Sequence, residues 1–153
     1  MPALPLTGAC QCGALHYEVS KPPLTVVNCH CKNCQRASGA AFGTSVTISI
    51  DSLTFTKGEP ARVGWTIPAG RERYGLFCGV CGSRIANGSV PERGTYSLRA
   101  GTLDDTSWIE PAGDIWTEAA QPWVKMAATR LQYPRQPDSF AELIEAFRAK
   151  DIF

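Results

Sequence analysis

Seven cysteines gathered in three short clusters constrain this chain more than any other feature of its sequence. The clusters have the spacings C-x-C, C-x-C-x-x-C and C-x-x-C, and their members are Cys10, Cys12, Cys29, Cys31, Cys34, Cys78 and Cys81. An odd number of thiols cannot form a complete set of disulfides, and such clusters in a reducing compartment are more often metal ligands. The sequence therefore predicts a metal-binding domain.

The spacing within each cluster suits a shared metal ion. Side chains at positions i and i+2 of an extended segment point to the same face, so the pairs at 10–12 and 29–31 can each offer two sulfurs to one ion. The pair at 78–81 has the spacing of a zinc knuckle, in which Gly79 and Gly82 would ease the tight turn.

Several partitions of the thiols are possible, because the pairs at 10–12 and 78–81 could each join other cysteines. The most economical partition is four plus three. Four thiolates would form a closed tetrahedral zinc site, and a closed site of this kind has a structural role and contributes to folding. Its ligands would be Cys10, Cys12, Cys78 and Cys81.

The remaining thiols, Cys29, Cys31 and Cys34, would hold a second zinc ion with one coordination position free. Three protein ligands and an open position are typical of catalytic zinc, so these three cysteines are the predicted catalytic residues. The alternative is that His16, His30 or a distant carboxylate closes the site, although His30 should project away from its two neighbours. A thiol that enters the open position would lose its proton, which favours a thiol substrate.

Composition indicates one globular domain and gives no sign of a nucleic-acid or membrane partner. The 153 residues, of which 44% are hydrophobic and 19% charged, fit a single domain over 1–153 with its own core. A formal net charge of +1 gives no reason to expect nucleic acid or a membrane as partner. No apolar run approaches the roughly 18 residues of a membrane span, and the first residues do not resemble a signal peptide. We therefore expect a cytoplasmic protein.

Short segments rich in β-branched or alternating apolar residues predict a mainly β domain of antiparallel strands. The predicted strands are 14–19, 24–29, 44–50, 53–56, 62–67, 73–78 and 95–100. The last part of the chain differs, because apolar residues recur there at helical spacing after Ser139 and Glu142, which have the form of a capping box. We expect an amphipathic helix over 139–150 that covers the sheet.

The cysteines lie in three distinctive stretches, GACQCGALHYEV, NCHCKNCQRASGAAF and LFCGVCGSRI, which are followed by RAGTLDD and DIWTEAAQPWV. In this order they resemble the glutathione-dependent formaldehyde-activating enzyme family, also called the CENP-V/GFA domain family, over about residues 7–125. The resemblance implies a β-tent fold of two antiparallel sheets. It also implies that the four-cysteine set holds the structural zinc and that Cys29, Cys31 and Cys34 hold the catalytic zinc.

The family resemblance further implies a carbon–sulfur lyase reaction, in which a thiol adds reversibly to formaldehyde. With glutathione the product would be S-hydroxymethylglutathione. An alternative from another class is a non-catalytic module that binds or carries glutathione or another thiol. A zinc-stabilised nucleic-acid module is a third reading, but 15 basic against 14 acidic residues provide no basic stripe.

A few other residues could assist at the open site, each with a simpler explanation. Arg36 could pair with a substrate carboxylate, and is the predicted substrate-binding residue, although a solvated or structural arginine on a turn is the simpler explanation. Trp116 and Trp123 could line a pocket, but tryptophan is more often simply buried. Asp104 and Asp105 could form an acid–base pair, but they more readily organise a turn through Asx-type hydrogen bonds.

Overall fold

Two sheets make up most of the computed structural model, which describes residues 2–67 and 70–153. The smaller sheet is antiparallel, with the strand order β1 (Leu6–Ala9), β2 (His16–Val19) and β5 (Leu53–Lys57). The larger sheet has the order β11 (Leu131–Tyr133), β10 (Gly113–Ile115), β3 (Thr25–Cys29), β4 (Gly43–Ser49), β9 (Thr95–Arg99), β8 (Arg84–Val90), β7 (Glu72–Phe77) and β6 (Ala61–Thr66). The helices are α1 (Lys32–Ser38) and α2 (Ala141–Arg148), with short 3-10 helices at Ile50–Ser52, Ala100–Thr102 and Thr117–Ala119.

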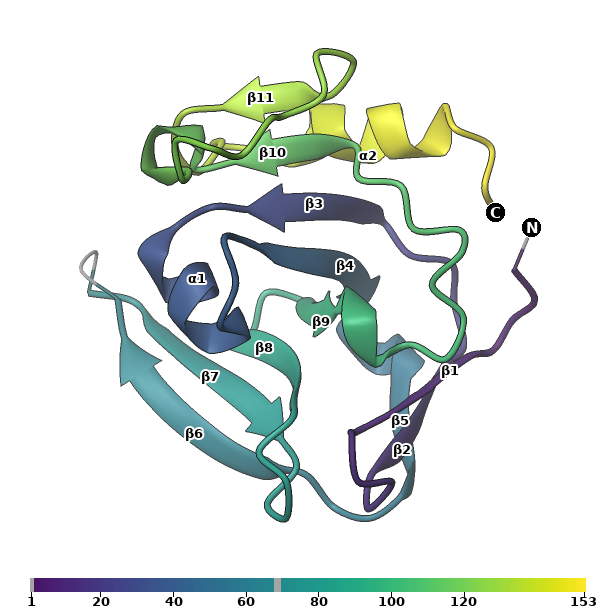
Figure 1. The fold of residues 1–153 in the computed structure, drawn as a ribbon. Helices are drawn as coiled ribbons and strands as arrows, with labels where there is room; N and C mark the ends of the chain where they lie inside the picture. Colours follow the sequence, from purple (N-terminus) through teal and green to yellow (C-terminus); the bar gives the residue numbers. More distant parts are fainter. Residues whose placement is uncertain (1, 68–69) are drawn as a thin grey trace.

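The mainly β fold with two sheets and a C-terminal helix is confirmed. All seven predicted strands are present, with ends that move by at most two residues. The sheets are antiparallel except at β10, which runs parallel to β3 and β11. Parallel neighbours need a crossover rather than a hairpin, and the long chain between β3 and β10 provides one. In Figure 1 the larger sheet bends, with α1 between β4 and β7 and with α2 next to β10 and β3.

Four strands were not predicted from the sequence. Strands β1, β10 and β11 have only three or four residues, too few for a clear alternation. Strand β8 contains Asn87-Gly88, a pair that usually indicates a hairpin turn. Here Gly88 lies against the ring of Tyr74, because a Cβ on Gly88 would be 2.3 Å from Tyr74 Cζ. A close approach between strands therefore explains this glycine.

Helix α1 is not predicted by the sequence, which indicates an extended segment at 29–31 and a turn at Arg36. Cys31 is its N-cap and accepts a hydrogen bond from the Cys34 N–H, so a metal-ligand candidate begins the helix. Gly39 ends the helix in the left-handed region at φ 65°, and its N–H donates to the Gln35 carbonyl. The seven residues of α1 are too few to show a helical pattern in the sequence.

The C-terminal helix is confirmed but is shorter than the predicted 139–150, and its capping box does not form. The Ser139 hydroxyl accepts the Ala141 N–H (3.1 Å), whereas Glu142 instead accepts a hydrogen bond from the Tyr133 hydroxyl. The helix is fixed to the sheet by Leu143, which is fully buried and lies over Gly113 of β10. A Cβ on Gly113 would be 2.4 Å from Leu143 Cδ2, so only glycine allows this contact.

The two sheets meet at the segment that follows β9. The buried Tyr17 hydroxyl of β2 forms a hydrogen bond with Thr102 Oγ1 (2.8 Å), and the Asp104 N–H donates to the Thr7 carbonyl of β1 (3.0 Å). Gly8 pairs with Leu103 in an isolated bridge and makes room for the Tyr17 ring. Among residues 2–67 and 70–153, no helix has the length and apolarity that a membrane crossing requires.

Leu143→Ala should lower the free energy of unfolding by about 2–5 kcal/mol, because it leaves a cavity between α2 and β10. Glu145→Ala on the exposed side of the same helix is the matched control and should change stability by less than about 0.5 kcal/mol. Urea unfolding at constant metal content measures both effects. Equal losses in the two variants would mean that α2 is not part of the core.

Candidate metal centres

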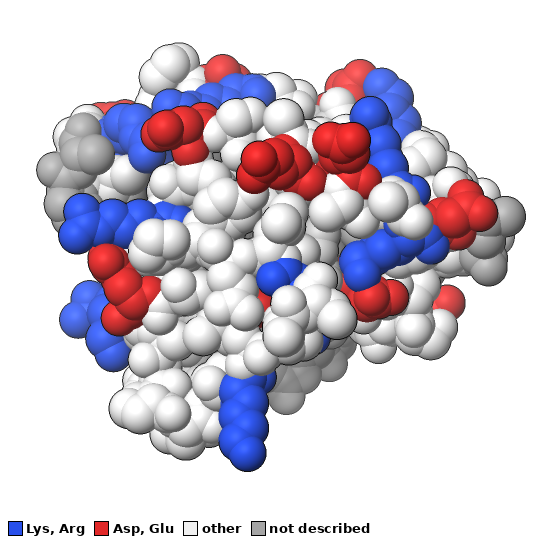
Figure 2. Space-filling model, turned by 90° about the horizontal axis from the view of Figure 1, so that it is seen from above, with Lys and Arg blue, Asp and Glu red and all other residues white. Residues whose placement is uncertain are grey.

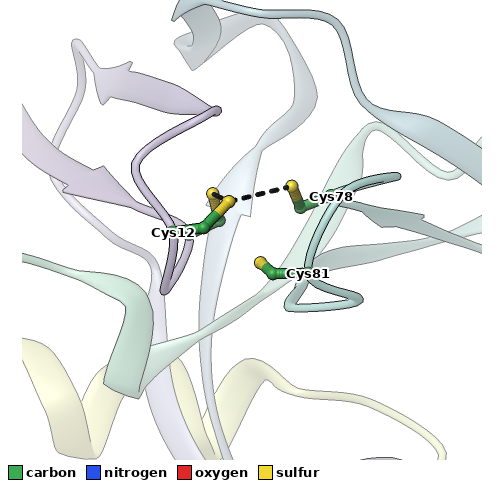
Figure 3. A group of neighbouring side chains, drawn as sticks. Cys12, Cys78 and Cys81 are labelled. Atoms are coloured by element: carbon green, nitrogen blue, oxygen red, sulfur yellow. Dashed lines mark hydrogen bonds between the residues drawn. The ribbon is translucent and has the colours of Figure 1, made fainter.

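Four cysteine sulfurs from two distant turns converge at one point. Cys10 and Cys12 lie in the turn between β1 and β2, and Cys78 and Cys81 lie in the turn between β7 and β8. Their Sγ atoms all lie within 4.8 Å of one another, with 3.6 Å from Cys10 to Cys12 and 3.8 Å from Cys12 to Cys78 (Figure 3). Sulfurs around a tetrahedral metal with bonds of about 2.3 Å lie about 3.8 Å apart. The donor set therefore fits a closed four-thiolate metal site, as the sequence predicts.

The two turns that supply these sulfurs have the same construction. In one, the Gly13 N–H donates to the Cys10 carbonyl (3.1 Å), and in the other the Gly82 N–H donates to the Cys78 carbonyl (2.8 Å). Both glycines have a positive φ, at 72° and 76°, which side-chain-bearing residues rarely adopt. The predicted role of Gly82 is confirmed, whereas Gly79 has no positive φ and takes no such part.

Hydrogen bonds in the second turn favour the thiolate that a metal requires. The Ser83 hydroxyl lies 3.2 Å from Cys81 Sγ, and the hydrogen bonds from the Ser83 side chain and backbone lower the pKa of Cys81 to about 5. The same hydroxyl accepts the Gln11 N–H (3.1 Å) and so connects the two turns directly. This serine is a site residue that the sequence analysis missed.

The second cluster is built where β3 ends and α1 begins. Cys29 is the last residue of β3, Cys31 caps α1, and Cys34 lies one turn further along that helix. Their sulfurs all lie within 4.8 Å of one another, and hydrogen bonds from Cys29 and Cys34 lower the pKa of Cys31 to about 2. Within the parts of the chain that the structure describes, no other Cys, His, Asp or Glu ligand atom joins this group. The three thiols therefore form a candidate site with three protein ligands.

His30 does not complete this site. It is fully buried, and its Nε2 lies 2.9 Å from Asp114 Oδ1 on β10, which confirms that the side chain turns away from the two flanking cysteines. Its backbone N–H also donates to the Ile115 carbonyl (3.0 Å). His16 is exposed on β2 and belongs to neither cysteine group.

A buried polar network holds the segment that carries the three thiols. Asp114, which is 1% exposed, also accepts the side-chain amide of Asn28 (3.2 Å) and lies 3.5 Å from Arg130 Nη1. Gln35 of α1 donates to the carbonyls of His30 (2.6 Å) and Ala119 (2.9 Å). Neither Asp114 nor Gln35 was predicted as a site residue, although Asp114 begins the stretch DIWTEAAQPWV. Their role depends on partners far along the chain, which the sequence alone does not identify.

The other predicted residues have varied surroundings. Arg36 is exposed on the last turn of α1. Trp116 is half-buried and donates to Gln136 (3.3 Å), but Trp123 is 72% exposed, so the expectation of burial is wrong for Trp123. The Asx turn is confirmed at Asp105, which accepts hydrogen bonds from the N–H and the hydroxyl of Ser107.

Basic and acidic side chains are interspersed on the face that Figure 2 shows. This face carries no continuous basic stripe, in keeping with the formal net charge of +1. A mixed surface of this kind provides no extended field for a polyanion. The absence of a nucleic-acid partner and the cytoplasmic location both stay predictions.

The fold and the two cysteine groups define a class of mainly β proteins with thiol clusters that could hold metal ions. A family model described as glutathione-dependent formaldehyde-activating enzyme matches residues 5–119, and the chain belongs to this family. A crystal structure of a Rhodobacter sphaeroides protein, a structural genomics target, matches with a TM-score of 0.52 and 20% sequence identity. The match covers 69% of this chain and 92% of that chain and supports the fold. A search of curated proteins found no match.

Cys78→Ser should remove one metal ion per chain and unfold the protein. A structural thiolate–metal site contributes on the order of 10 kcal/mol to folding, which is comparable with the whole stability of a small domain. Circular dichroism and elemental analysis measure the two effects. Val80→Ser, an exposed change in the same turn, is the control and should retain both the metal and the fold. A folded Cys78→Ser protein with full metal content would contradict the assignment.

Asp114→Ala should weaken metal binding at the three-thiol cluster by about 10- to 100-fold, the usual cost of removing a group that orients metal-bearing residues. It should also destabilise the fold by about 1–3 kcal/mol, because the buried side chains of His30 and Asn28 lose their acceptor. Competition with a chelator measures the affinity. Asp105→Ala removes an exposed carboxylate and should leave the affinity unchanged.

Proposed function

We propose that this protein is a zinc-dependent carbon–sulfur lyase that forms or breaks adducts between a thiol and an aldehyde. Glutathione and formaldehyde, the pair in the family description, are the first substrates to consider. Cys29, Cys31 and Cys34 would hold the zinc ion at which the thiol reacts. The other four cysteines would hold a second, structural zinc ion.

The observation that carries this proposal is the unequal number of ligands in the two clusters. Four sulfurs close one group, whereas the other group has three sulfurs in a segment that is only half-buried at Cys31 and Cys34. Closed four-ligand sites are typical of structural zinc, and three ligands with an open position are typical of catalytic zinc. A zinc ion bound there would convert an entering thiol into a thiolate nucleophile at neutral pH.

The proposed reaction balances without an oxidant or a further reactant. The thiol sulfur forms a bond to the aldehyde carbon, the carbonyl π bond breaks, and the thiol proton moves to the aldehyde oxygen. The product is a hydroxymethyl thioether when the aldehyde is formaldehyde. The residues of this chain contribute by placing three sulfurs at the end of β3 and the start of α1, held there by the buried contacts of His30 and Gln35.

Cys31→Ser should abolish any acceleration of adduct formation while leaving the protein folded. The serine removes one of three ligands from the open site but leaves the four-sulfur group intact. Exchange NMR on an equilibrated mixture of glutathione and formaldehyde measures the rate above the spontaneous reaction. Asn33→Ser changes an exposed neighbour in the same helical turn and should retain the wild-type rate.

The same assay separates the enzyme from a binding module. A wild-type protein that binds glutathione but never exceeds the spontaneous rate would favour the non-catalytic module. If Cys31→Ser unfolds in the same way as Cys78→Ser, the division into a structural and a catalytic site is wrong. Two zinc ions per chain, with the one at the three-thiol cluster more easily removed by a chelator, would support the division.

A further inference from the structure

A buried arginine without hydrogen-bond partners lies beside the three-thiol cluster. Arg99, at the end of β9, is only 9% exposed, and its Nε and Nη1 atoms have no hydrogen-bond partner among the described residues. No carboxylate of residues 2–67 or 70–153 lies within 4 Å of its guanidinium nitrogens. A buried charge with unfilled donors is costly unless an anion accepts those hydrogen bonds.

The register of the larger sheet places Arg99 on the same face as the cluster. Arg99 pairs with Ser45 of β4, and Ser45 pairs with Val27 of β3. Paired residues share a face of the sheet, and Cys29 lies two residues beyond Val27, so its side chain also lies on this face. In Figure 1 these three strands are neighbours, next to α1.

Gly43 and Gly75 leave the space that two guanidinium groups occupy, those of Arg99 and of Arg84 on β8. A Cβ on Gly43 would lie 2.6 Å from Arg99 Nη1 and 3.6 Å from Cys34 Cβ, so the arginine and the cysteine approach the same point. A Cβ on Gly75 would lie 2.3 Å from Nη1 of Arg84. Any larger residue at either position would displace a guanidinium group.

Both arginines line an open pocket of about 380 Å³ that contains no acidic side chain. Ser38, Thr44, Ser83 and Thr102 add hydroxyl groups to its lining. Both positive charges face the same pocket, and burial, followed by the charge of Arg99, lowers the pKa of Arg84. Arg84 donates one hydrogen bond to Asn87 (2.9 Å). The pocket is therefore complementary to an anion.

We propose that Arg99 determines substrate specificity by binding a carboxylate of the thiol substrate while the sulfur of that substrate occupies the open position beside Cys34. This inference rests on the proposed function. A carboxylate accepts strong, charge-assisted hydrogen bonds from a guanidinium group, and Arg99 has unfilled donors on Nε and Nη1. Arg84 adds a second positive charge in the same pocket. The preferred thiols are those that carry a carboxylate a few bonds from sulfur.

Calorimetry on the zinc-loaded protein without aldehyde tests this proposal with two thiols of similar size. The probes are 3-mercaptopropionate, which carries a carboxylate, and 3-mercapto-1-propanol, which is neutral. Wild type should bind the carboxylate about 10- to 100-fold more tightly, the range expected for hydrogen bonds to a charged group. This comparison needs no variant, and equal affinities would overturn the proposal.

Arg99→Gln should remove the preference for the carboxylate and leave the affinity for the neutral thiol unchanged. Arg99→Lys retains the positive charge but replaces the planar guanidinium group with a single ammonium group, and it should show an intermediate preference for the carboxylate. Arg148→Gln, at an exposed arginine on α2, is the matched control and should retain the full preference. Arg36→Gln tests the arginine that the sequence predicts to bind the substrate. Zinc content and the thermal midpoint of each variant report on its fold.

Two results with these variants would overturn the proposal. An equal loss of affinity for both thiols in Arg99→Gln would mean that the arginine only balances the charge of the thiolates. Loss of the preference in Arg36→Gln alone would assign the carboxylate to Arg36. The proposed enzyme activity can fail separately from the carboxylate site. A preference that depends on Arg99, without any acceleration of adduct formation, would support the carboxylate site and contradict the enzyme activity. Equal acceleration of adduct formation with both thiols would support the enzyme activity and contradict the carboxylate site.

Discussion

Convergence of four sulfurs from two turns is the interaction on which the rest of this structure depends. It joins the β1–β2 turn of the smaller sheet to the β7–β8 turn of the larger sheet, across 66 residues of sequence between Cys12 and Cys78. A metal ion held there would restrict the unfolded chain and fix how the sheets meet. The contacts of Tyr17 and Leu103 then bury the junction between the sheets.

The larger sheet, fixed in this way, presents one face to the three-thiol cluster. Strand β3 ends at Cys29, and the chain turns at once into α1, which brings Cys34 back toward the strand end. Asp114, on the parallel neighbouring strand β10, holds this turn in place through its hydrogen bond with His30. The chemistry of the site therefore depends on a short helix whose position is set by a buried hydrogen bond to a distant strand.

The sequence was informative about the parts of the fold that follow local rules. Alternation predicted the longer strands, and periodicity predicted α2 through residues such as Leu143 and Phe147. Prediction fails where a residue depends on a partner that is distant in the sequence. Asn87-Gly88 lies within β8 because Gly88 accommodates the aromatic ring of Tyr74. Helix α1 begins at Cys31, where the sequence indicates an extended segment. Trp123 is exposed although its type favours burial.

The sequence by itself determined which neighbouring cysteines can share an ion, because spacings of two and three residues bring their sulfurs together, and it favoured four plus three as the most economical partition. The structure brings the sulfurs together in those two groups. It also predicted that His30 is a poor ligand, since a residue between two side chains on one face of an extended segment should project to the opposite face. Only the tertiary structure decided what surrounds those sulfurs. Arg99 lies 65 residues from Cys34 in the chain, and only the pairing of β9 with β4 and the absence of a side chain at Gly43 bring its charge to the site.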